Sequence, residues 1–201
     1  MNPIIKNSLK NSMTYHAYRE LVKQMVDEKS TTGANKSEDF VSHTKLSEQR
    51  MKRWDKTIKI SEDDTRKIQA FNHKLIWLVI AESWCGDAAH VVPVLNKIAE
   101  LNPNIDLKIV LRDDNLALMD LYLTNGGRSI PKLIIINAGT GNVLDTYGPR
   151  PTEATNYVNR YKAKHGTLTP EFKEDLQHWY NKNKGENVIK DLTELLAEIK
   201  L

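Results

Sequence analysis

Cysteine is nearly absent from this sequence of 201 residues, because Cys85 is the only one. A single thiol excludes an intramolecular disulfide and a zinc site built from several cysteines. Scarcity of cysteine also agrees with a reducing compartment. The chain is therefore expected to fold by burying apolar side chains, which make up 40% of its residues.

Long hydrophobic runs are also lacking. No segment approaches the ~18 consecutive apolar residues that a transmembrane helix needs. The start of the chain, MNPIIKNSLKNSMTYHAY, is interrupted by Lys6, Asn7 and Lys10, so it lacks the apolar core of a signal peptide. The sequence therefore predicts a soluble, cytoplasmic protein with no membrane partner.

A large excess of one charge is missing as well, since the formal net charge is only +3 at pH 7. One basic stretch surrounds Trp54 and consists of Lys52, Arg53, Lys56 and Lys59. It has no second basic stripe beside it, which favours a solvated helix face over a nucleic-acid site. The histidines show no metal-ligand spacing. We therefore expect no nucleic-acid partner, no metal and no other cofactor.

The two ends of the chain have the periodicity of helices. Between Tyr15 and Val26 the apolar residues fall on one helix face, behind Thr14 as a cap. Acidic first turns predict further helices that begin near Ser37 and Ser61. Two more helices are predicted between Leu168 and Leu201.

The middle of the chain alternates strands with helices. The continuous apolar run LIWLVIA, residues 75–81, is typical of a strand that is covered on both faces. Further strands are predicted at 107–111, 132–136 and 143–147, and helices at 86–101, 115–123 and 151–164. This order predicts an α/β fold with a mixed central sheet flanked by helices.

Four landmarks follow one another along these elements in a familiar order. They are Trp84-Cys85-Gly86 after the first core strand, Pro93 in the next helix, Ile130-Pro131 before the third strand, and Gly148 after the fourth. In this arrangement the sequence resembles the thioredoxin family. The resemblance implies a thioredoxin-like domain over residues 61–165, with a helical extension at 1–60 and another at 166–201 packed on the domain.

The resemblance also implies a site. The Ile130–Pro131 bond is expected to be cis, beside a groove that holds a peptide or a thiol ligand. The implied catalytic residue is Cys85. The implied groove residues are Trp84, Gly86, Asp87, Ile130, Pro131 and Gly148.

Two departures from the family concern the reaction. A dithiol thioredoxin needs a second cysteine to resolve its mixed disulfide, and Ala88 occupies that position here. Val79 stands where the family has a buried aspartate. The ordinary dithiol cycle is therefore not expected.

Three functions stay open for Cys85. A position at a helix N-terminus favours the thiolate, whereas the nearby carboxylate of Asp87 disfavours it. The leading hypothesis is monothiol disulfide exchange with a protein or a low-molecular-weight thiol. The alternative is a non-catalytic binding module that uses the cis-proline groove, and a third is a peroxide-reducing thiol with Arg128 as the donor. The motifs of monothiol glutaredoxins are not matched, so no iron–sulfur cluster is expected.

Two polar residues near Cys85, Glu82 and His90, are predicted to have structural roles. Glu82, three residues before Cys85, is a candidate proton-shuttling carboxylate in place of the missing aspartate, but the favoured prediction is that it faces solvent at the end of its strand. His90 is predicted to be exposed, or to form a capping pair with Asp87, because five residues separate it from Cys85 and turn it away from the thiol.

Overall fold

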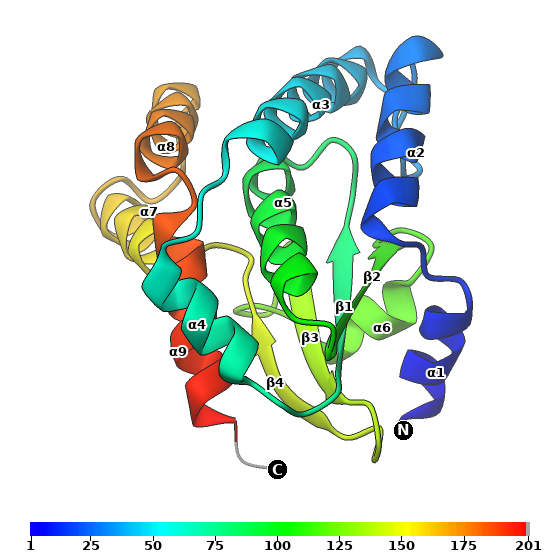
Figure 1. The fold of residues 1–201 in the computed structure, drawn as a ribbon. Helices are drawn as coiled ribbons and strands as arrows, with labels where there is room; N and C mark the ends of the chain where they lie inside the picture. Colours follow the sequence, from blue (N-terminus) through cyan, green and yellow to red (C-terminus); the bar gives the residue numbers. More distant parts are fainter. Residues whose placement is uncertain (200–201) are drawn as a thin grey trace.

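A four-stranded mixed sheet forms the centre of the molecule in the computed structural model, which describes residues 1–199 (Figure 1). Its strands are β1 (Leu75–Ala81), β2 (Ile105–Leu111), β3 (Lys132–Asn137) and β4 (Val143–Tyr147). They lie in the order β2-β1-β3-β4. Strand β1 is parallel to β2 and antiparallel to β3, and β3 is antiparallel to β4.

Strand β1 is central in this sheet, and its sequence reflects that position. It forms hydrogen bonds with a neighbouring strand on each side, and Trp77, Leu78 and Val79 have no exposed surface. Because β1 is covered on both faces, it has no alternation of apolar and polar residues. Residues 82–85 connect the end of β1 to the start of the next helix.

Helices cover both faces of the sheet. Helix α5 (Gly86–Leu101) lies in front of the sheet in Figure 1, in contact with α4 (Glu62–Ala70) and α9 (Glu186–Glu198). Helix α6 (Leu116–Leu121) lies behind the sheet, next to α1 (Pro3–Lys10). The remaining helices are α2 (Tyr15–Asp27), α3 (Glu38–Thr57), α7 (Thr152–His165) and α8 (Pro170–Asn183). Mixed α/β architecture with terminal helices is thus confirmed.

The N-terminal helices share the core of the sheet. Ile5, Tyr18 and Val22 are completely buried in the same apolar cluster as β1. Met13 also pairs with Ile109 at the outer edge of β2, through two backbone hydrogen bonds of 2.9 and 2.8 Å. The domain boundaries at 60/61 and 165/166 stay a prediction, but residues on either side of the first boundary pack into one core. None of the helices described over residues 1–199 is both long and apolar enough to cross a membrane.

Candidate functional site

Cys85 lies at the junction of β1 and α5. It is the N-cap of α5, and its Sγ accepts a hydrogen bond from the Ala88 amide at 3.4 Å. The thiol also donates to the carbonyl oxygen of Ile130 at 3.3 Å. The Ile130–Pro131 peptide bond is cis. The fold therefore brings Cys85 into contact with Ile130-Pro131, the segment that was expected to lie beside it.

The environment of Cys85 favours the protonated thiol. Only 8% of the residue is exposed. Burial raises the pKa of Cys85 to about 12, and the negative charge of Asp87 acts in the same direction. The amides of Ala88 and Asp87 lower the pKa, as expected at a helix N-terminus, but their effect is smaller. Near neutral pH the sulfur is therefore protonated, and the S–H group donates its hydrogen bond to the Ile130 carbonyl oxygen.

Asp87 connects the active-site turn to the C-terminal part of the chain. Its Oδ1 accepts a hydrogen bond from the Tyr180 hydroxyl at 2.9 Å. Its Oδ2 forms an ion pair with Arg150 at 2.6 Å. Only 11% of the Asp87 side chain is exposed, so this carboxylate is committed to protein partners.

His90 is buried, and the prediction of an exposed or capping residue was wrong. Its Nδ1 accepts a hydrogen bond from Trp54 Nε1 at 2.8 Å. The proton must then lie on Nε2, which is 2.9 Å from the Gln177 side-chain oxygen. The ring also stacks on Tyr180 with centroids 4.4 Å apart. His90 thus joins α3, α5 and α8, and burial lowers its pKa to about 3.

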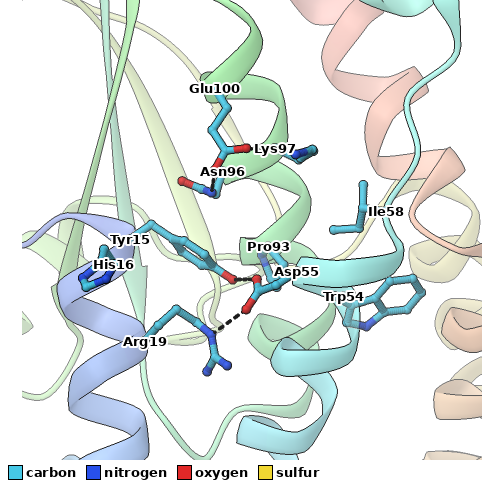
Figure 2. Close-up of a pocket in the computed structure, with 10 residues that line it drawn as sticks. All are labelled: Tyr15, His16, Arg19, Trp54, Asp55, Ile58, Pro93, Asn96, Lys97 and Glu100. Atoms are coloured by element: carbon cyan, nitrogen blue, oxygen red, sulfur yellow. Dashed lines mark hydrogen bonds and ion pairs between the residues drawn. The ribbon is translucent and has the colours of Figure 1, made fainter.

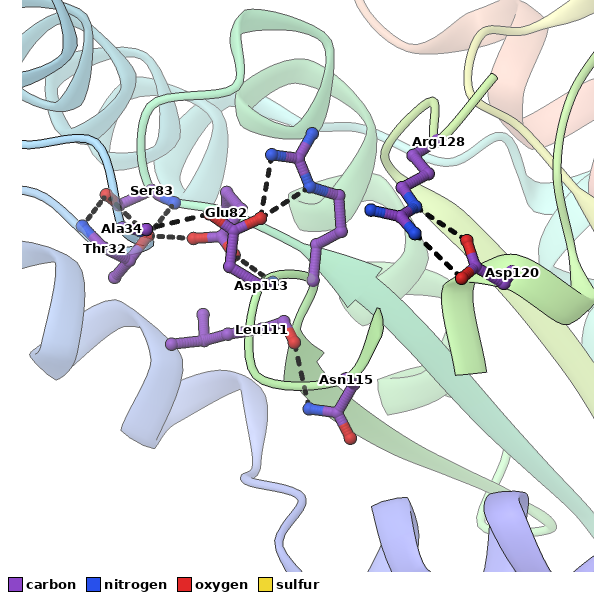
Figure 3. A network of polar contacts seen from close by, with 10 residues as sticks. Thr32, Ala34, Glu82, Ser83, Leu111, Asp113, Asn115, Asp120 and Arg128 are labelled. Atoms are coloured by element: carbon purple, nitrogen blue, oxygen red, sulfur yellow. Dashed lines mark hydrogen bonds and ion pairs between the residues drawn. The ribbon is translucent and has the colours of Figure 1, made fainter. Parts of the chain in front are cut away.

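Glu82 is also buried, contrary to the prediction that it faces solvent. One carboxylate oxygen accepts a hydrogen bond from the Thr32 hydroxyl, and the other accepts one from the Asp113 amide at 2.9 Å (Figure 3). Asp113 in turn accepts a bond from the Ala34 amide at 3.2 Å. Among residues 1–199 the Glu82 carboxylate forms no hydrogen bond with Cys85; the Cys85 amide donates to the main-chain carbonyl oxygen of Glu82 instead, at 3.2 Å. It fixes the loop around Thr32 to the end of β1, which is a positioning role.

A groove of about 710 Å³ opens beside Cys85. Helix α3 supplies one wall, α8 supplies the other, and the active-site turn lies between them. Its lining contains five large apolar side chains: Phe40, Leu46, Trp84, Leu168 and Leu176. Both walls belong to the helical extensions predicted outside the thioredoxin-like core. Of these five residues the sequence assigned only Trp84 to a groove, because the five come together only in the tertiary fold.

A second pocket, of about 340 Å³, lies between α2, α3 and α5 (Figure 2). Most of its polar side chains form hydrogen bonds or ion pairs with one another. Asp55 accepts a hydrogen bond from the Tyr15 hydroxyl at 2.5 Å and forms an ion pair with Arg19 at 3.0 Å. Lys97 and Glu100 form another ion pair at 3.1 Å. The groove beside Cys85 is therefore the better candidate site.

Arg128 does not support a peroxide-reducing thiol. Its guanidinium donates two hydrogen bonds to Asp120, at 2.6 and 2.8 Å. The donor that this hypothesis required is thus engaged elsewhere (Figure 3). Among residues 1–199, no three His, Cys, Asp or Glu side chains gather as metal ligands would.

Gly148 holds the end of β4 against the start of β3. Its φ of +99° lies in the region that favours glycine. A Cβ atom at this position would overlap the carbonyl oxygen of Pro131. The glycine therefore permits a close approach of two backbone segments near Ile130.

Replacing Gly148 by alanine is expected to lower the free energy of unfolding by about 2 kcal/mol, because backbone strain and overlap add together. Gly166→Ala is the matched control. Gly166 has a φ of +77° but nothing within 4 Å of a Cβ atom, so only about 1 kcal/mol is expected. Urea unfolding of both variants measures the difference. Equal losses would show that the approach to Pro131 does not require glycine.

Comparison with known proteins agrees with this arrangement. A family model described as thioredoxin matches residues 33–164. The chain belongs to this thioredoxin family. The match begins before α3, so it includes the helix that forms one wall of the groove.

One solved structure supports the same fold, and a second is also similar to the chain. An HIV epitope scaffold is similar with a TM-score of 0.56 and 16% identity, over 94% of this chain and 100% of the scaffold. A protein of unknown function from Pseudomonas aeruginosa has a TM-score of 0.49 and 20% identity, over 73% of this chain and 84% of its own. A search of curated proteins gives no match.

Proposed function

We propose that this thioredoxin-family protein is a binding module, which holds a ligand or a protein partner in the groove beside Cys85. The observation that carries the proposal is the state of the thiol. Cys85 is buried, donates a hydrogen bond to the Ile130 carbonyl oxygen and has a raised pKa. Disulfide exchange begins with attack by a thiolate, which this environment disfavours.

The lining of the groove supports the same function. Its volume falls within the range of about 300–1,000 Å³ that is typical of ligand pockets. The ring of Trp84 packs edge-on against Phe40, with centroids 4.8 Å apart. On another side the guanidinium of Arg112 lies 4.8 Å from its centroid. Trp84 is thus held in place, and preorganised aromatic walls lower the entropy cost of binding.

Monothiol exchange is the second candidate, favoured by the Ala88 amide that points at Sγ. In such a step the Cys85 thiolate attacks one sulfur of a disulfide, the old S–S bond breaks, and the other sulfur leaves as a thiolate. With Ala88 in place of a resolving cysteine, the new mixed disulfide would persist until an external thiol released it.

Intact-mass analysis distinguishes the two functions. The folded protein is incubated with bis(2-hydroxyethyl) disulfide at pH 7, with a urea-unfolded sample as the control. A binding module is expected to keep its mass while folded and to gain a mixed-disulfide adduct when unfolded, since unfolding exposes Cys85. Rapid formation of the adduct on the folded protein would favour monothiol exchange instead.

A further inference from the structure

Arg50 is a cation of the groove that lacks a partner. It lies on α3, and a Cβ atom built on Gly86 would be 3.3 Å from one of its guanidinium nitrogens. The guanidinium therefore sits over the first turn of α5, one residue from Cys85. Within residues 1–199 the Arg50 side chain forms no hydrogen bond and no ion pair.

The other charges of the groove are more nearly balanced. Arg150 forms its ion pair with Asp87, while Lys173 and Glu174 are exposed neighbours of opposite sign at the rim. Burial lowers the pKa of Arg50, and the positive charge of Arg53 adds to this effect against the smaller opposing influence of Asp87. The inner part of the groove thus has one positive charge that the protein does not neutralise.

We infer that Arg50 recognises an anion, and that the ligand of the groove is a small apolar molecule with one carboxylate group. This inference rests on the proposed binding function and names its ligand class. Arginine presents a planar fork of donors that matches a carboxylate. The N-terminus of α5, which is the positive end of its helix dipole, lies on the same side of the groove and also favours an anion. Phe40, Leu46 and Trp84 would cover the apolar body of the ligand.

A single carboxylate fits these charges better than a group of higher charge. Asp87 and Glu174 also line the groove, so a second negative charge on the ligand would meet repulsion. The apolar walls require a hydrocarbon or aromatic body.

Calorimetric titration with 4-phenylbutyrate and its neutral amide tests the inference. The acid is expected to bind the wild-type protein about tenfold more tightly than the amide, because hydrogen bonds to charged partners are the stronger ones. Arg50→Gln is expected to abolish this preference by weakening only the acid. Lys52→Gln removes the same charge from an exposed position of α3 and should preserve the preference. Thermal unfolding verifies that each variant is folded.

The outcomes separate the two proposals. Equal binding of the acid and the amide overturns the carboxylate inference, while the groove still binds ligands. Loss of the preference in Lys52→Gln overturns the role of Arg50. Failure of both compounds to bind at millimolar concentration contradicts the ligand class itself. A mixed disulfide on the folded protein together with an intact acid preference would refute the non-catalytic function but keep the anion site.

Discussion

Replacing Glu82 by alanine is expected to lower the free energy of unfolding by about 3–4 kcal/mol. The substitution removes the acceptor for the Thr32 hydroxyl and for the Asp113 amide. The Asp113 amide left without an acceptor costs about 1–3 kcal/mol, the buried Thr32 hydroxyl keeps only its bonds to Ser83, and the missing side chain leaves a cavity. Urea unfolding followed by tryptophan fluorescence measures the loss.

Glu82→Gln is the matched variant, with an expected loss of about 1 kcal/mol or less, since an amide can bond to the same groups. Burial raises the pKa of Glu82 above its ordinary value of 4.5 despite the opposing hydrogen bonds. The folded protein then holds this proton more tightly than the unfolded chain, so the wild type loses stability as pH rises above 4.5. The glutamine variant lacks this loss. A glutamine variant as unstable as the alanine variant would show that the network needs a carboxylate.

The elements of the core could be predicted from local sequence. An uninterrupted apolar run predicted β1 at 75–81, and the helical pattern of apolar residues predicted α5 at 86–101; both agree with the structure. These signals are local, because a strand buried on both faces has no polar positions. Helix α1 was not predicted, although Asn2 caps it and Pro3 begins it.

The surroundings of Cys85 could not be read in the same way. Glu82 was predicted to face solvent because it lies at the end of a strand, and His90 because its spacing from Cys85 turns it away from the thiol. Their burial depends on the loop around Thr32 and on α3 and α8, which are distant in sequence. The sequence predicted helices at the positions of α3 and α8 but did not identify the surfaces that these helices cover. The groove, and the position of Arg50 within it, likewise depend on how α3 and α8 pack around Cys85.

Acidification should destabilise the protein through His90. Burial holds the pKa of His90 at about 3 in the folded state, against an ordinary value of 6.5. A histidine with a depressed pKa contributes stability that is present above pH 6.5 and is lost as pH falls toward the folded pKa. The loss approaches about 1.4 kcal/mol per pH unit below 6.5, or roughly 4–5 kcal/mol by pH 3. Above pH 4.5 the titration of Glu82 changes the free energy of unfolding in the opposite direction. A variant is therefore needed to isolate the contribution of His90 to the pH dependence.

His90→Gln isolates the contribution of His90 to the pH dependence, because glutamine does not titrate. This variant is expected to be less stable than the wild type at pH 7.5, since glutamine cannot reproduce the contacts with both Trp54 and Tyr180. Its unfolding free energy should nevertheless fall much less steeply between pH 6.5 and 4. His178→Gln, an exposed change on α8, should retain the wild-type slope. Urea unfolding at four pH values in this range supplies the comparison.

Parallel pH profiles for the wild type and His90→Gln would mean that His90 accepts a proton readily in the folded state. The neutral ring that joins Trp54 to Gln177 would then be the wrong description of this contact.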